Sequence, residues 1–584
     1  MGLLLALAAG ASLLTLMLYY WLVAHFMQGQ SPLANAEYIM DIHTVSARIA
    51  AVLHLLAGGA LFLVLYRGLR GVPLEKLRGW AWHHRWIGWG AALVTGLTVT
   101  LWLTGVLRGA PSSEDDLTYF FQARLFANGQ TMLPTAQWGP LAQGLEWWWT
   151  IPGTRGICSF QVPGHSLLLV PGAWLGQFSL VPAAEAVVTG LATYRAALLL
   201  FGRRTAALTA ILFATSPYVY TTFSGYSAST STACMVSLAL WAWAALLHKA
   251  TARRAFVLGV CIGLVCWIRP AAALFVSVPM AAWLLVCMVR GVSSWRLAPA
   301  GLAGVIPLVA LYIGYCTYVS GRPAFTPGSV YAERLGSGEL SPENVIQAPP
   351  RQAIHLPGTL IGLARLNIYL HGWPLSLLPL LVLPLLPGKG ARTWVLIVPV
   401  VSVLCFYAFY RAVTGWYYFE VAPLMYILSA RSVVLMRAWV RRRQRPFLIR
   451  ALPRLVCAGV ILSCVQSIPL AMARQHDYVQ VFNNVHEEVF ERLAGRPAAI
   501  LMAPDEWSRW GAYLTGRNSP FLDDEVVYVN ASGGHWDRRQ LEAVVGRREF
   551  YYLRIDDPPQ ESLTLERVWE SAGLIWLGWP VGFA

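Results

Sequence analysis

The stretch WIGWGAALVTGLTVTLWLTGVL (86–107) is followed closely by SSEDDLTYFFQARLFANGQ (112–130). The first segment is long and apolar enough to cross a bilayer core about 30 Å thick, which takes roughly 20 helical residues. The second opens with three consecutive acids, Glu114, Asp115 and Asp116. Only 12% of the 584 residues are charged and 57% are hydrophobic, whereas soluble proteins carry about 25% charged residues. The sequence therefore predicts a polytopic α-helical membrane protein with dense negative charge at the mouth of a span.

Runs of comparable length recur along the chain and predict about thirteen transmembrane helices. The first run lacks the basic leader of a signal peptide and is expected to be a retained span. A shorter segment, GHSLLLVPGAWLG (164–176), is bracketed by Gly and Pro and is expected to be re-entrant or juxtamembrane. The predicted spans are Leu3–Phe26, Val45–Tyr66, Trp86–Leu107, Ala183–Phe201, Thr205–Tyr220, Ser231–Leu247, Ala255–Ile268, Ala271–Val289, Leu297–Val319, Trp373–Leu386, Trp394–Tyr410, Tyr417–Met436 and Leu455–Ala473.

The distribution of charge predicts the orientation. Basic residues gather in alternate loops, of which RRRQRPFLIRALPR (441–454) has six arginines and no acid. By the positive-inside rule these loops are cytoplasmic, as is the N-terminus. The net charge of +15 is thus a topology signal, and no nucleic-acid partner is expected. We expect a multi-pass protein of the inner or plasma membrane with large external segments at 108–182, 321–371 and 475–584.

The last of these segments reads as a small α/β domain. The runs AAILMAP, EVVYVNA and EFYYLRI alternate with turn residues and with the amphipathic DRRQLEAVVG. Three parts are therefore expected: an extra two-span segment (1–85), a transmembrane catalytic module (86–474) and an extracytoplasmic α/β domain (475–584).

The nine cysteines include no CxxC pair, so neither a disulfide framework nor a zinc site is expected. Eight of them fall in apolar runs. Cys158 lies in the first external loop and is expected to be exposed.

The acids after the third span have two interpretations. In the structural one, Ser112, Ser113 and the acids cap the helix DLTYFFQARLFANG, which ends at Gly129. In the functional one, they belong with other polar, aromatic and cationic stretches predicted on the same membrane face. These stretches are TRGICSFQVPGHSLLLVPG, FATSPYVYTTFSGYSAST, WIRPAAALF and YRAVTGWYYFEVAPLMYILSARS.

This constellation resembles the GT-C superfamily of membrane glycosyltransferases, and within it the protein O-mannosyltransferases and lipid-linked aminoarabinose transferases. Their acidic pair in the first external loop, followed by a Tyr and an Ala-Arg, matches Asp115-Asp116, Tyr119 and Ala123-Arg124. A Pro-Pro-Gly or Pro-Pro-Leu element later in the loop is reduced here to VPGHSLLL, with Val162 where the first Pro is expected. LLLFGRRTAALTAILFATSP is similar to a further landmark, and the resemblance covers roughly 86–474.

The resemblance implies an inverting glycosyltransferase that takes a sugar from a polyprenyl-phosphate donor on the extracytoplasmic face. The acceptor, a lipid, glycan or protein hydroxyl, must lose its proton, and Asp115 matches the family's general base. Asp116 is expected to orient the acceptor or to hold a divalent cation, Mg or Mn, with no other cofactor. Membrane lipids are the remaining partners.

Arginine suits the leaving lipid phosphate because its guanidinium binds phosphate oxygens in a bidentate manner. Arg411 is favoured over Arg269, since an interfacial arginine before a proline is more often a lipid-headgroup anchor. Carboxylates at membrane depth are costly and tend to be functional, which draws attention to Glu185 and Glu420. The expected donor-phosphate and substrate ligands are Arg411, Arg269, Arg155, His165, Tyr417, Tyr418 and Glu420, with Arg351 and Arg365 as further external arginines.

Three alternatives stay open at this point. EWWWT (146–150) offers faces for stacking a sugar, but an interfacial aromatic belt is the more ordinary account. Haem ligation by His43, His54, His83 and His84 is less favoured than interfacial histidines. A non-catalytic permease or lipid flippase would also be polytopic, but it predicts inverted repeats and polar groups at mid-membrane, and no repeat is evident.

Overall fold

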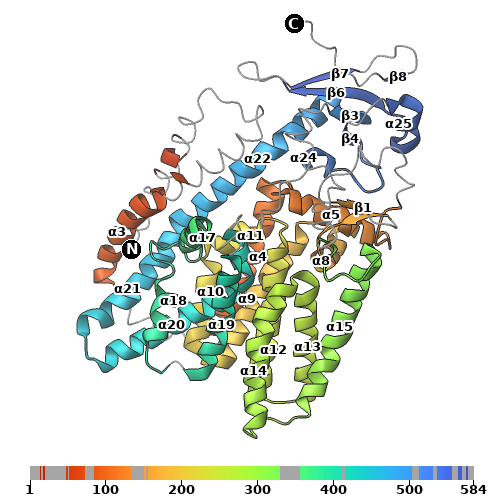
Figure 1. Ribbon diagram of the computed structural model, residues 1–584. Coiled ribbons are helices and arrows are strands. Elements are labelled where there is room, and N and C mark those ends of the chain that lie inside the picture. The colour runs from red at the N-terminus through yellow and green to blue at the C-terminus, as the bar shows by residue number, and fades with distance from the viewer. Residues whose placement is uncertain are drawn as a thin grey trace.

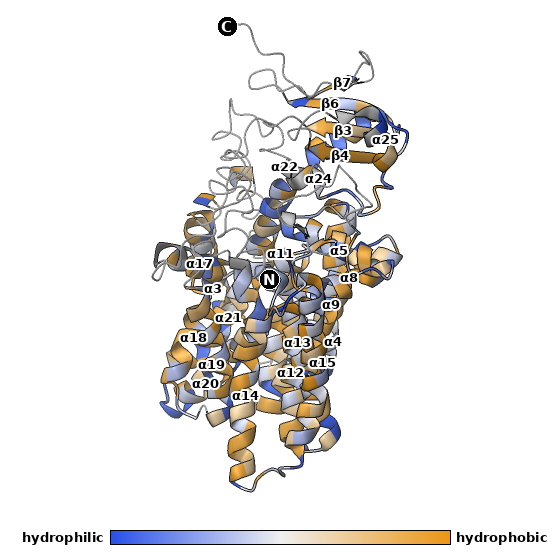
Figure 2. Cartoon of the chain, turned by 45° about the vertical axis from the view of Figure 1, so that its right-hand side comes forward, coloured by the Kyte–Doolittle hydropathy of each residue, from blue (hydrophilic) through white to orange (hydrophobic). Residues whose placement is uncertain are grey.

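The computed structural model describes residues 14, 17–19, 21, 48–49, 52–72, 84–134, 150–152, 156–328, 356–388, 390–408, 415–502, 512–530, 536–555, 563–567 and 574–575. Within them, eight helical segments are long and apolar enough to cross a membrane (Figure 2). They are His84–Val106 (α4, His84–Leu101, with η4, Trp102–Val106), α9 (Leu180–Phe201), α12 (Ala228–His248), α14 (Pro270–Val289), α15 (Leu297–Ser320), α19 (Gly390–Tyr407), Tyr417–Arg442 (from η8, Gly415–Val421, into α20, Ala422–Arg442) and Pro446–Gln480 (α21, Pro446–Leu462; η9, Ser463–Ser467; and part of α22, Ile468–Leu493).

This count is lower than the thirteen predicted spans, chiefly because several apolar runs form short or broken helices. The run Thr205–Tyr220 is divided at Ser216, which caps a second helix, into α10 (Arg203–Ala214) and α11 (Pro217–Phe223). The run Trp373–Leu386 contains three prolines and yields only α18 (Leu378–Val382) and the turn η7 (Leu383–Leu385).

The remaining short helices are α13 (Ala252–Ile268), α17 (Leu356–Tyr369), η1 (His54–Gly58), α3 (Gly59–Gly68) and η2 (Leu69–Gly71). Most of the first predicted span and the start of the second lie outside the described residues. The overall class, a polytopic helical membrane protein with a small C-terminal sheet, is confirmed.

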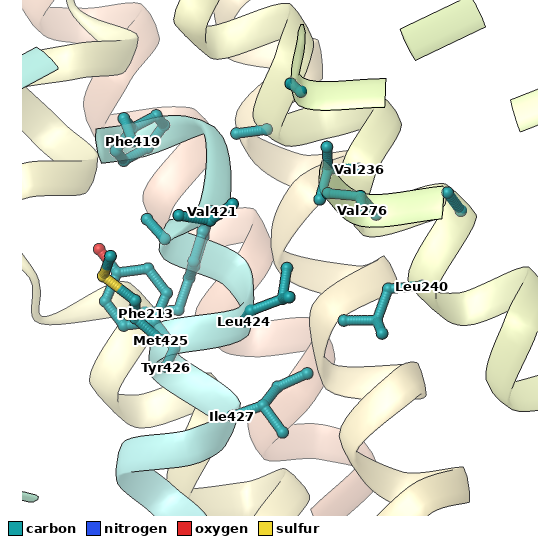
Figure 3. Packing of buried hydrophobic residues seen from close by; sticks show 14 of the residues in the cluster. Phe213, Val236, Leu240, Val276, Phe419, Val421, Leu424, Met425, Tyr426 and Ile427 are labelled. Atoms are coloured by element: carbon teal, nitrogen blue, oxygen red, sulfur yellow. The ribbon is translucent and has the colours of Figure 1, made fainter. Parts of the chain in front are cut away.

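The bundle packs around the first part of α20, in which every residue from Ala422 to Ala430 is buried. Leu424 and Ile427 of α20 face Val236 and Leu240 of α12, and Phe213 of α10 lies on the opposite flank (Figure 3). An apolar helix that is buried all round occurs at the centre of a large bundle, so α20 is its central helix.

A layer of short elements covers one end of the bundle. It contains α5 (Glu114–Ala127), the strand pair β1 (Thr150–Pro152) and β2 (Ile157–Ser159), and α8 (Pro163–Trp174). The helix predicted after the acidic cluster is α5, and the GHSLLLVPGAW segment is α8, which lies outside the eight spans.

Cys158 corrects one prediction. Its side chain is fully buried and packs with Met132 and Val319. The pairing of β1 with β2, in which Cys158 lies opposite Ile151, folds the loop back onto the end of α15 and removes the thiol from solvent. Burial raises its pKa to about 12.

The C-terminal region forms the predicted α/β arrangement. Its four-stranded sheet has the order β4-β3-β6-β7, in which β3 (Ala498–Met502) runs parallel to β4 (Val526–Asn530) and β6 (Glu549–Ile555). The edge strand β7 (Leu563–Arg567) is antiparallel to β6. The additional elements are α24 (Ala512–Thr515), α25 (Arg538–Val545), β5 (Trp536–Asp537) and β8 (Leu574–Ile575).

This sheet and the α5 layer lie at the same end of the molecule, and the turn between α14 and α15 lies at the other (Figure 1). The helix α22 rises out of the bundle to the sheet and runs without a break through residue 475. The three-part division at 85 and 474 stays a prediction, as does the side of the membrane that each end faces.

Candidate active site

The N-terminus of α5 is fixed by two serines. Ser113 caps the helix, its Oγ accepting a hydrogen bond from the backbone N–H of Asp116 at 3.3 Å. Ser112 donates from both its backbone N–H and its hydroxyl to Oδ2 of Asp116, each at 2.7 Å. The predicted serine cap is therefore present, and the two acids that follow it meet different surroundings.

Asp115 is half-buried and accepts a hydrogen bond of 2.8 Å from Nε2 of Gln161. Its pKa is raised to about 6, first because burial disfavours the charged form and second because the neighbouring Asp116 repels it. The positive charge of Arg269 and the Gln161 hydrogen bond act in the opposite direction. The carboxyl group therefore titrates close to neutral pH, where a general base is most effective.

Asp116 is fully buried, and burial raises its pKa as well. Its Oδ2 holds both hydrogen bonds from Ser112, whereas Oδ1 has no hydrogen-bond partner among the described residues. Ser112 approaches this closely because residue 225 is a glycine: a Cβ there would lie 2.8 Å from Oγ of Ser112. Asp116 is thus held on one oxygen by Ser112, and the backbone of Tyr226 also favours its charged form.

His165, from the first turn of α8, connects α5 to α9 and α12. Its Nδ1 lies 2.7 Å from Oγ of Ser231, which in turn donates to Glu185, and its Nε2 lies 2.5 Å from the carbonyl of Tyr226. Its ring meets Tyr119 of α5 edge-on at 4.5 Å. Burial lowers the pKa of His165 to about 4. Because both ring nitrogens are engaged by groups of the protein, neither is left to bind a phosphate, so this geometry favours a positioning role over the predicted substrate-binding one.

Arg269 occupies the junction between α13 and α14, as the C-cap of one and the N-cap of the other. It forms an ion pair of 3.0 Å with the buried Glu420 and donates to the hydroxyl of Tyr407 at 3.2 Å. Tyr407 donates to the same Glu420 at 2.7 Å. The guanidinium also lies 5.4 Å from the centre of the Tyr417 ring.

Arg269 is therefore not the exposed headgroup anchor that the sequence favoured. Its side chain is only 23% exposed, and its charge acts on the Asp115 carboxylate. Because Glu420 already neutralises it in part, the Arg269 group is a preorganised cation beside the general-base candidate.

The other predicted site residues are distributed as follows. Tyr418 is fully buried, and its hydroxyl has no hydrogen-bond partner among the described residues. Arg365 lies on α17, where burial lowers its pKa. His54 and His84 bond to the carbonyl of Trp373 and the hydroxyl of Tyr194, respectively. Outside the described residues lie Arg411, Arg155, Arg351, His43, His83 and the tryptophans of EWWWT.

A divalent cation was predicted at Asp116. Among the residues that the structure describes, no three His, Cys, Asp or Glu side chains come together. Oδ1 of Asp116 fits a different kind of site, because Mg²⁺ is often held by one or two carboxylates together with substrate phosphates.

Gln161 and Tyr407 were not predicted from the sequence. Each is brought to the site by packing between segments far apart in the sequence, Gln161 from the loop before α8 and Tyr407 from the end of α19. Glutamine in a loop and tyrosine at a span end are common, so no local signal marks them. Glu185 was noted only as a carboxylate that is costly to place at membrane depth. It accepts hydrogen bonds from the hydroxyls of Thr230 and Ser231.

No family model and no curated protein matches the sequence. Solved structures do match the fold. ArnT from Cupriavidus metallidurans, determined with bound undecaprenyl phosphate, superposes with a TM-score of 0.50 at 13% identity, over 81% of this chain and 97% of ArnT. The apo structure of the oligosaccharyltransferase of Archaeoglobus fulgidus superposes with a TM-score of 0.40 at 14% identity, over 81% of this chain and 70% of that chain. The structure of the same protein with Zn and sulfate gives a TM-score of 0.41 at 12% identity, over 81% of this chain and 73% of that chain.

The similarity to ArnT extends over almost the whole of that enzyme, although few residues are identical. The chain therefore shares the fold of ArnT.

Proposed function

We propose that this protein is a glycosyltransferase that moves a sugar from a polyprenyl-phosphate donor to an acceptor hydroxyl. The observation that carries the proposal is Asp115, whose carboxyl group lies at one end of the helical bundle. The pKa of this group is about 6, and the positive charge of Arg269 acts on it. The ArnT fold supports the proposal, since that structure holds undecaprenyl phosphate.

The proposed reaction is a single displacement with inversion at the anomeric carbon. The acceptor oxygen forms a bond to that carbon while its proton passes to Asp115. The bond from the carbon to the phosphate oxygen breaks, and its electron pair leaves with the lipid phosphate. Arg269 stabilises the negative charge of this leaving group, and it needs little reorganisation because Glu420 and Tyr407 hold the guanidinium in place.

Asp116 and His165 act by positioning in this scheme. Asp116 fixes the first turn of α5 through Ser112, and His165 fixes the helix from the other side through Tyr119. A divalent cation, when bound, would be held by Oδ1 of Asp116 and would supply positive charge near the donor phosphate.

Substitution of the base tests the proposal. Asp115→Asn keeps the shape of the side chain but removes its basicity, so transfer from a polyprenyl-phosphate sugar should fall about 10²- to 10⁴-fold. Activity is measured with a panel of lipid-linked sugars, and correct folding is checked by gel filtration and thermal melting. Full activity in Asp115→Asn would contradict the assignment, as would transfer from nucleotide sugars alone.

The external location of the site is also a proposal, supported by the basic loops at the opposite end of the bundle. With Cys158 buried, an engineered cysteine is required. In a cysteine-free background, Asn128→Cys, an exposed position at the end of α5, should react with an impermeant maleimide in intact cells. Lys249→Cys, after α12, should be protected, and the reverse pattern would place the site on the cytoplasmic side.

A further inference from the structure

A groove of about 540 Å³ lies far from the candidate active site, on the side of the helical bundle. Its floor is α12 and its walls are α9 and α13, both of which pack against α12. α12 begins beside the site, where Ser231 contacts His165, and ends at His248 in the groove. At 1.5 Å per residue, these two residues lie roughly 25 Å apart along the helix.

The groove combines an apolar surface with a cationic end. Trp241 is 39% exposed and Val257 is 44% exposed, both on helices of the bundle. The lining also includes Leu198, Leu238, Arg195, His248, Arg253 and Arg254, and it contains no acid. An anion with an apolar body is complementary to such a surface.

Arg195 is the least ordinary member of this set. It lies inside the span Leu180–Phe201, about two turns before the end, and its side chain is exposed on the outside of α9. Charged residues within a span are costly and usually mark a functional contact. Within the described part of the chain, neither Arg195 nor Arg253 forms an ion pair, whereas Arg254 is engaged in donating to the carbonyls of Ala245 and Lys249.

We propose that this groove binds one anionic phospholipid from the leaflet opposite the candidate active site. Its phosphate would lie between Arg195 and Arg253, and an acyl chain would cover Leu198, Leu238 and Trp241. Basic pockets between transmembrane helices are suited to anionic lipid headgroups, and the volume is in the usual range for a small-ligand site. A soluble anion would not account for the exposed apolar floor.

The experiment is native mass spectrometry of the full-length protein in detergent, with phosphatidylglycerol and phosphatidylcholine added in equal amounts. The wild type should retain one phosphatidylglycerol in preference to phosphatidylcholine. The double variant Arg195→Gln/Arg253→Gln should retain it about thirtyfold less well, as expected for the loss of two basic residues beside an anionic lipid.

Matched controls separate this site from general surface charge. Arg290→Gln/Arg296→Gln removes two exposed arginines from the same end of the bundle but outside the groove, and it should retain the lipid like the wild type. Arg195→Lys/Arg253→Lys preserves the charge and should retain most of the binding, which guards against a folding defect in the glutamine variant. Equal retention of both lipids by the wild type, equal loss in the two glutamine variants, or displacement by excess inorganic phosphate would each overturn the proposal.

Discussion

At the scale of single residues, the first turn of α5 shows how two adjacent aspartates acquire different roles. Asp116 is fully buried and holds two hydrogen bonds from Ser112 on one oxygen. Asp115 is half-buried and accepts a hydrogen bond from the Gln161 amide. Adjacent residues of an α-helix point about 100° apart, so the two side chains meet different neighbours.

The raised pKa of Asp115 makes a pH prediction. A general base must be ionised, so transfer should decline as pH falls through about 6, instead of near the ordinary aspartate value of 3.8. The Gln161 hydrogen bond stabilises the charged form and lowers the pKa. In Gln161→Ala the acid limb should therefore move upward, by about half to one pH unit for an ordinary hydrogen bond.

The measurement is the pH profile of kcat/KM for the wild type and Gln161→Ala in one buffer series. Gln130→Ala serves as the control, because it removes a glutamine that follows the same helix, α5, without touching Asp115. An acid limb that lies near pH 4 in the wild type, or one that moves downward in Gln161→Ala, would contradict the assigned base.

Much of this site could be predicted from sequence, and the limit has a physical cause. The acidic pair, its serine cap and the α5 helix depend on residues close together in the chain, so Asp115 and Asp116 were identified. The ion pair and hydrogen bond of Arg269 could not be predicted, because its partners Glu420 and Tyr407 lie well over a hundred residues away. The contacts of His165 could not be predicted for the same reason, since Ser231 and Tyr226, which engage its nitrogens, lie more than sixty residues away.

At the scale of elements, α8 gives the reduced proline motif a physical meaning. Pro163 starts the helix, where a missing N–H costs nothing. Gly164 faces the end of α13, and a Cβ there would lie 2.6 Å from the backbone of Trp267, two residues before Arg269. The motif therefore sets the distance between the helix that carries His165 and the junction that carries Arg269.

Gly164→Ala should separate these two elements. Overpacking of this kind costs about 1–3 kcal/mol, and a shift of about 1 Å at a reacting group can lower the rate a hundredfold. We expect a lower melting temperature and a fall in kcat larger than the change in KM. Gly314→Ala, in the helix α15 where a Cβ meets nothing within 4 Å, should leave both unchanged. Normal turnover in Gly164→Ala would show that the α8–α13 contact does not position the site.

The count of spans shows where element prediction reaches its limit. Hydropathy identified the apolar runs correctly, but it cannot distinguish a span from an apolar helix that ends at an internal cap. Ser216 is such a cap: its hydroxyl accepts from the N–H of Val219 and contacts Tyr426 of the central helix at 2.8 Å. That second contact is tertiary, and it helps to divide one predicted span into α10 and α11.

At the scale of the whole molecule, the C-terminal sheet is packed between the helix that carries Asp115 and the helix that connects the sheet to the bundle. One face contributes Val527 and Val529 to a cluster with Leu117, Phe121 and Leu125 of α5. The other face packs on α22. α21, η9 and α22 form a continuous helical segment from the bundle to the sheet (Figure 1). The helix α5 therefore lies between the bundle and the sheet and packs against both.

Two neighbouring valines on β4 can test whether this contact matters for catalysis. Val527 faces α5, and Val526 belongs to the cluster on the α22 side. Each Val→Ala change removes two buried methyl groups, so both Val527→Ala and Val526→Ala should destabilise the sheet by about 2 kcal/mol. Only Val527→Ala also loosens the support of α5, and it should lower kcat severalfold, with up to about a hundredfold loss if the helix moves by about 1 Å. Thermal melting and transfer assays of the two variants, compared at equal folded fraction, provide the measurement. If the two valines lowered kcat equally, the sheet would act only through its overall stability, and the packing against α5 would have no separate part in aligning Asp115.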